Sequence, residues 1–115
     1  MAVTIYHNPR CSKSRATLAL LQEKGVELKV VEYLKAPPSK AEMKRILKAL
    51  GMEPRDLMRR KEAPYAELGL DNPKLGRDDL IDSMIANPIL IERPVVASDG
   101  KYALGRPPES VLAIL

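Results

Sequence analysis

The chain has 115 residues, which suits one domain with a single core, and its 45% content of hydrophobic residues excludes a disordered chain. It contains neither Phe nor Trp, so we expect a core of aliphatic side chains and Met. The net charge of +4 comes from dispersed Lys and Arg residues, which favours a small anionic ligand over nucleic acid.

The single cysteine excludes an internal disulfide and fits a reducing compartment. No apolar run approaches the ~20 residues that span a bilayer, and the N-terminus has no basic stretch followed by a long apolar run. We therefore expect a cytoplasmic protein that has no membrane partner.

The first third of the chain predicts a βαβ unit. An apolar run at residues 3–6 predicts a short buried strand, helical spacing covers residues 12–24, and Gly25 provides the stop. Alternation and β-branched residues over 27–33 predict a second strand. A strand, a helix and a strand in so short a segment imply a parallel pair of strands.

Residues 36–88 predict a helical block without a strand. Pro37-Pro38 interrupts the chain, and the capping-box pattern at 39–42 begins a helix that Gly51 ends. Further helical segments are expected to begin at Pro54, Pro64 and Arg77.

Strand character returns at residues 89–91 and 94–97. Asp99-Gly100 is a hairpin turn signal, residues 101–104 are expected to pair back across it, and Pro107 is expected to begin a last α-helix. This order is that of a thioredoxin-like α/β fold, with a mixed four-stranded sheet, flanking helices and an inserted helical subdomain at about residues 36–88. We expect residues 1–115 to form one domain.

The candidate reactive residue is Cys11, which lies where the first strand gives way to a helix N-terminus. That position offers unpaired backbone N–H groups and a partial positive charge, and Arg10, Lys13 and Arg15 add cations. A lone cysteine is often a buried small hydrophobe, but these polar neighbours favour a thiol with a lowered pKa beside a cradle for an oxyanion.

Two nearby residues have open roles. Ser14 stands where a Cys-x-x-Cys pair has its second thiol, so an oxidised Cys11 must be resolved by an external thiol such as glutathione. Either Ser12 or Ser14 only caps the helix, or Ser14 donates a hydrogen bond to the thiolate. His7 is either structural or tunes Cys11. Asn8 and Pro9 are expected to shape the loop.

Arginines at the ends of predicted strands are candidates for binding an oxyanion, because the planar guanidinium fits such a group. Arg93 precedes one strand and Arg106 follows the hairpin, whereas Arg59 and Arg60 end a short helix in the inserted block. The phosphatase motif C-x5-R does not fit, because Arg15 follows Cys11 by only four positions. One His and one Cys predict no metal site.

These residues resemble the ArsC-type family of glutaredoxin-dependent arsenate reductases, and most closely a small chromosomal branch of it. The resemblance runs almost end to end and is carried by these stretches: Ile5-Tyr6-His7-Asn8-Pro9-Arg10-Cys11, Ser14-Arg15, Tyr33-Leu34, Pro37-Pro38-Ser39, Leu57-Met58-Arg59, Pro64-Tyr65, Leu68-Gly69-Leu70, Asn87-Pro88-Ile89-Leu90-Ile91, Arg93-Pro94 and Gly105-Arg106-Pro107.

The resemblance implies a thioredoxin-like fold in which Cys11 attacks arsenate, glutathione is the co-substrate and glutaredoxin reduces the resulting mixed disulfide. It implies no bound cofactor. The residues that match the family's oxyanion-binding arginines are Arg59, Arg93 and Arg106; His7 and Ser14 match positions that tune the thiolate, and Pro94 matches a cis-proline loop that faces the cysteine.

Two alternatives remain beside arsenate reduction. One is a related glutathione-linked thiol oxidoreductase that acts on another substrate. The other is a regulator of the Spx type, which binds RNA polymerase and typically uses a Cys-x-x-Cys switch. Ser14 speaks against that switch, and a pure binding module would leave the three arginines unexplained.

Overall fold

The computed structural model describes residues 2–92 and 94–115. These residues form two compact units, which we call the sheet unit (residues 2–36 and 94–115) and the helical unit (Pro37–Glu92). In the described chain, no helix has the length and apolar character needed to cross a membrane.

The sheet unit begins with the predicted βαβ arrangement. Strand β1 (Ala2–His7), helix α1 (Ser12–Glu23) and strand β2 (Glu27–Glu32) follow one another, and β1 pairs in parallel with β2. Gly25 follows the helix with φ of 69°, the left-handed conformation that glycine adopts without strain. The parallel pair brings the carboxyl ends of both strands to the same edge of the sheet, where the loop to Cys11 starts.

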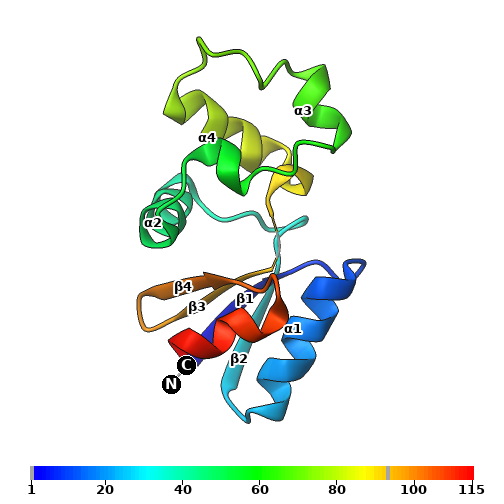
Figure 1. Cartoon of the computed structure of the whole chain (residues 1–115), viewed down its shortest axis with the longest axis vertical. Coiled ribbons are helices and arrows are strands. Elements are labelled where there is room, and N and C mark those ends of the chain that lie inside the picture. Colours follow the sequence, from blue (N-terminus) through cyan, green and yellow to red (C-terminus); the bar gives the residue numbers. More distant parts are fainter. Residues whose placement is uncertain (1, 93) are drawn as a thin grey trace. The chain divides into compact units, whose positions relative to one another are not determined.

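The sheet is completed by a hairpin of β3 (Val95–Ser98) and β4 (Lys101–Leu104), as predicted. Asp99 and Gly100 both have positive φ, 49° and 76°, which is the requirement of the tight turn that matches strand twist. Strand β3 lies antiparallel to β1, so the sheet is mixed and has the order β2-β1-β3-β4. Figure 1 shows this unit with α1 and the C-terminal helix beside the sheet.

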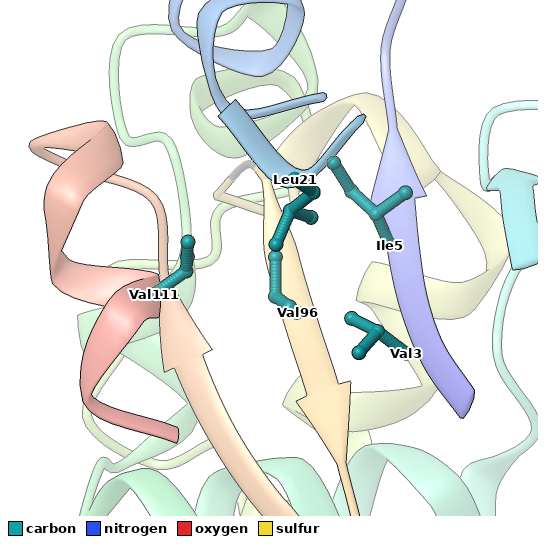
Figure 2. Close-up of a cluster of buried hydrophobic side chains, with 5 residues drawn as sticks. All are labelled: Val3, Ile5, Leu21, Val96 and Val111. Carbon is teal, nitrogen blue, oxygen red and sulfur yellow. The ribbon is translucent and has the colours of Figure 1, made fainter. Parts of the chain in front are cut away.

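The core of the sheet unit lies on one face of the sheet and is aliphatic, as the composition predicts. Alternate residues of β1 and β3 point to this face, where α1 and the C-terminal helix cover them. Each such side chain contributes about 1.5–3 kcal/mol when fully buried. Figure 2 shows the five that form the cluster: Val3, Ile5, Leu21, Val96 and Val111.

The helical unit contains α2 (Lys40–Leu50), α3 (Ala63–Glu67) and α4 (Arg77–Ala86), with the 3-10 helices η1 (Pro54–Leu57) and η2 (Pro88–Leu90). Its first helix has the predicted ends. The Ser39 hydroxyl accepts a hydrogen bond from the Glu42 N–H at 3.1 Å, and Gly51 ends the helix with φ of 66°.

Two expectations need correction. Residues 89–91 were expected to form a strand, but Pro88 begins the 3-10 helix η2, because its fixed φ suits a first helical position. Of these three residues, Ile91 alone forms an isolated antiparallel bridge, which pairs it with Met58. The last helix is also of the 3-10 type, η3 (Pro108–Ile114), rather than an α-helix.

Candidate active site

Cys11 lies half-buried at the N-cap of α1 and is not part of a disulfide. Its backbone N–H donates to the Asn8 carbonyl at 3.0 Å, and its carbonyl accepts from the Arg15 N–H at 3.0 Å. The residue is therefore the point at which loop and helix join, next to the unpaired N–H groups and partial positive charge of the first turn. A helix N-terminus of this kind is a favourable place for an anion.

The loop before Cys11 is held by Asn8, which is buried. The Asn8 side-chain oxygen accepts from the Arg10 N–H at 3.0 Å, and the Asn8 N–H donates to the Ser14 hydroxyl oxygen at 3.0 Å. The Asn8 carbonyl also accepts from the Cys11 N–H, so the side chain and backbone of Asn8 together fix the loop through three hydrogen bonds.

Ser14 is fully buried and faces His7, not the end of its own helix. The Ser14 Oγ lies 2.6 Å from His7 Nδ1. The Ser14 Oγ also accepts a hydrogen bond from the backbone N–H of Asn8, which lies outside the helix. Ser14 therefore does not cap α1, and the N-cap residue is Cys11. Two tautomers fit this distance. Either the Ser14 hydroxyl donates to Nδ1, or Nδ1–H donates to Ser14 and leaves its hydroxyl hydrogen to another acceptor.

His7 is buried at the end of β1, and burial lowers its pKa below the ordinary value of 6.5. The Arg15 guanidinium lowers the pKa of His7 further, whereas the Glu32 carboxylate raises it. The imidazole is consequently neutral at pH 7. It acts on its surroundings through the bond to Ser14 rather than as a cation.

Arg15 is exposed, and its Nη1 donates to the Pro9 carbonyl at 3.0 Å. This bond runs from the first turn of α1 back to the loop. Arg15 therefore braces the loop from outside while its charge remains near the helix N-terminus.

Arg106 follows a closely packed glycine. Gly105 is buried, its N–H donates to the Pro94 carbonyl at 2.9 Å, and the Thr17 hydroxyl of α1 lies 3.4 Å from the Gly105 carbonyl. A Cβ at Gly105 would overlap Thr17 Oγ1 and Pro94 Cγ. The exposed side chain of Arg106 thus starts from a backbone position that is fixed against α1 and Pro94.

Of the two candidate arginines in the helical unit, Arg59 is the more enclosed. Its Nη1 lies 2.9 Å from Glu92 Oε1, with the two side chains 27% and 23% exposed. The paired backbones bring them together: Arg59 N–H donates to the Leu90 carbonyl and Glu92 N–H to the Leu57 carbonyl, each at 2.7 Å. Arg59 and Glu92 are diagonal neighbours across this short pairing.

The guanidinium of Arg59 has further capacity, because its buried Nε has no hydrogen-bond partner among the described residues. Arg60 differs, since its Nη2 lies 4.0 Å from Asp56 Oδ1 and both side chains are more than half exposed. Arg93 and its bond to Pro94, where the cis-proline loop is predicted, lie outside the described residues. The Arg106–Pro107 bond is cis.

In the sheet unit, the structure brings together five of the predicted residues: His7, Asn8, Cys11, Ser14 and Arg15. Two contributors were missed. No motif indicated Thr17 beside Gly105. Glu92 could be linked to Arg59 only through the pairing of Met58 with Ile91, 33 positions apart in sequence. In the part of the chain that the structure describes, no group of three or more His, Cys, Asp or Glu side chains could hold a metal ion.

The sheet order, the inserted helical unit and a cysteine at the first helix N-terminus define a thioredoxin-like protein with one candidate reactive thiol. The ArsC family model matches residues 6–114. The chain belongs to the ArsC family.

Similar proteins cover almost the whole chain. An arsenate reductase of Neisseria meningitidis serogroup A is 50% identical over 98% of this chain and 97% of its own length. The uncharacterized protein YfgD of Escherichia coli K12 is 54% identical over 98% and 96%. The solved structure of an arsenate reductase from Vibrio cholerae has a TM-score of 0.95 and 51% identity, and covers 100% of this chain and 98% of its own.

Proposed function

We propose that this protein is an arsenate reductase in which Cys11 is the nucleophile. The observation that carries the proposal is the placement of Cys11 at the N-cap of α1, at the end of a loop that Asn8 and Arg15 fix. The names of the relatives at about half identity supply the substrate. The family match spans both units, so we treat residues 1–115 as one ArsC-type domain.

In the first step the Cys11 sulfur bonds to arsenic(V) and one arsenate oxygen leaves. The thiol and HAsO₄²⁻ give the ester Cys11–S–AsO₃²⁻ and water. The helix N-terminus favours the thiolate that attacks and the anion that it attacks.

The second step needs another thiol, and the sequence has Ser14 where a Cys-x-x-Cys pair has its second cysteine. A serine hydroxyl cannot form a disulfide with Cys11, and the Ser14 Oγ contacts His7 Nδ1 and the Asn8 N–H. Glutathione therefore attacks from solution. Its sulfur bonds to that of Cys11, two electrons pass to arsenic, and arsenite leaves, so that Cys11–SH, glutathione and HAsO₄²⁻ yield the mixed disulfide, HAsO₃²⁻ and water in total.

Glutaredoxin then reduces the Cys11–glutathione disulfide and takes up the glutathionyl group, which returns Cys11 to the thiol. A cycle that depends on reduced thiols suits the reducing cytoplasm, where we place the protein. The cycle requires no bound cofactor, because the electrons come from glutathione.

Arg59, Arg93 and Arg106 are the proposed ligands of the arsenate oxygens and of the ester. Two observations support these roles: the Nε of Arg59 has no hydrogen-bond partner among the described residues, and the backbone before Arg106 is fixed by close packing. His7 and Ser14 hold the loop around the thiolate, and one tautomer of His7 leaves the Ser14 hydroxyl hydrogen to the sulfur.

The test is NADPH oxidation in a coupled system with arsenate, glutathione, glutaredoxin and glutathione reductase. We expect arsenate-dependent turnover by the native protein and none by Cys11→Ser, whose melting temperature shows whether it is folded. Absence of turnover by the native protein, while Cys11 still reacts with iodoacetamide, would reject arsenate as the substrate and favour a related thiol oxidoreductase.

A further inference from the structure

A pocket of about 310 Å³ lies within the sheet unit, at the edge where the parallel strands β1 and β2 end. The loop that leads to Cys11 forms one wall, and the residues that follow β2 form the other. Such an edge of a parallel pair is a common place for ligands. The lining residues are His7, Asn8, Pro9, Arg10, Glu32, Leu34 and Lys35.

The charges around this pocket are of both signs. Arg10 and Lys35 are exposed cations, and Glu32 is an exposed carboxylate that lies opposite His7 in the strand register. Lys35 Nζ lies 3.9 Å from Glu32 Oε1, with side chains 82% and 48% exposed, so their pairing contributes little and both groups can contact a ligand.

The far wall combines a fixed backbone with an apolar side chain. The Glu32 carbonyl accepts hydrogen bonds from the backbone N–H groups of Lys35 and Ala36, each at 3.0 Å, which shapes the turn after β2. This turn presents Leu34, which is 37% exposed although it is a large hydrophobic residue. Leu34 and Pro9 give the pocket an apolar part between its charges.

We propose that this pocket is the subsite for glutathione, an inference that rests on the proposed function. Glutathione carries two carboxylates and one ammonium at neutral pH, which matches the two cations and one carboxylate of the pocket. The volume is at the lower end of the ~300–1,000 Å³ that small-molecule sites occupy. Arg10 lines the pocket and directly precedes Cys11. A peptide bound in the pocket is therefore one residue along the chain from the cysteine whose sulfur it attacks.

Arsenate is a poorer occupant of the same pocket. A tetrahedral dianion has no group for the Glu32 carboxylate, which would repel it, and none for Leu34. The charges and the apolar part of the pocket therefore suit the reducing peptide better than the oxyanion.

The direct test is binding of S-methylglutathione, which has no free thiol, to the full-length Cys11→Ser protein by titration calorimetry. Adding Lys35→Glu should weaken binding about fivefold, because an attraction becomes a repulsion. The matched control is Lys29→Glu, an exposed lysine of β2 that does not line the pocket, and it should leave affinity unchanged. Equal affinities in the two variants would overturn the proposal.

A kinetic test separates this inference from the proposed function. In the protein with Cys11 intact, Lys35→Glu should raise the KM for glutathione about fivefold and leave the KM for arsenate unchanged. If arsenate is not turned over but S-methylglutathione binding depends on Lys35, the proposed substrate fails and the subsite stands. If Lys35→Glu raises the KM for glutaredoxin alone, the pocket is a protein-docking surface and the subsite is rejected.

Discussion

His7 illustrates how one buried side chain couples the stability of the protein to pH. It is the only histidine in the chain, and burial lowers its pKa. In the unfolded chain, His7 therefore binds a proton as the pH falls below about 6.5, whereas in the folded protein His7 is still neutral at that pH. The stability that neutral His7 contributes is complete above pH 6.5 and is lost as the pH falls toward its folded pKa.

We expect the free energy of unfolding of the native protein to fall by up to about 1 kcal/mol more than that of His7→Gln between pH 7.5 and 5.5. Urea titrations of both proteins at the two pH values measure this. The carboxylates titrate in both proteins and cancel in the comparison. Equal pH dependence would show that His7 is not protected from protonation.

At this scale the sequence predicts the position of Cys11 but not the contacts around it. An apolar run followed by helical spacing is enough to place Cys11 at a helix N-terminus. The bond between His7 and Ser14 depends on how the loop folds back over the helix, which no periodicity records. Sequence alone left Ser14 as a cap or a hydrogen-bond donor, and the structure excludes the cap.

Gly105 joins three parts of the sheet unit, because it directly follows β4 and packs against Thr17 of α1 and against Pro94, which precedes β3. We expect Gly105→Ala to destabilise the protein by about 1–3 kcal/mol, since the new methyl group must displace one of these neighbours. The shift should move Arg106 and raise the KM for arsenate. Chemical denaturation and the coupled assay measure the two effects.

The matched control is Gly76→Ala, because Gly76 has no positive φ and a Cβ there would meet only Asp79 Oδ2 at an ordinary 3.5 Å. As an N-cap position it should lose less than about 1 kcal/mol and leave the KM unchanged. If Gly105→Ala and Gly76→Ala change the stability and the KM for arsenate equally, the close packing around Gly105 does not affect function.

The type of an element was predictable from the sequence where its pattern of apolar and capping residues was long, and the prediction was wrong where that pattern was short. Helix α2 has both its cap and its terminal glycine in the sequence, and it forms as predicted. The three apolar residues at 89–91 carry no such signal, so the preceding Pro88 decides for a 3-10 helix. The bridge between Met58 and Ile91 is a tertiary contact, and with it the pairing of Arg59 and Glu92 was beyond prediction.

At the scale of the whole molecule, the sequence predicts a helical block at about residues 36–88, and the structure has a helical unit at Pro37–Glu92. The start of the helical unit was predictable because Pro37-Pro38 interrupts the chain. The predicted end lies earlier than the observed one, because residues 89–91 were interpreted as a strand of the sheet. The family model matches residues 6–114, so the match includes both Cys11 in the sheet unit and Arg59 in the helical unit.

The central claim is that Cys11 passes from an arsenate ester to a mixed disulfide with glutathione. Intact-mass spectrometry after incubation with arsenate and reduced glutathione, without glutaredoxin, tests it most directly. We predict one glutathionyl group on Cys11 that appears only when arsenate is present and disappears when glutaredoxin is added. No adduct with arsenate present, or the same adduct without arsenate, would contradict the account.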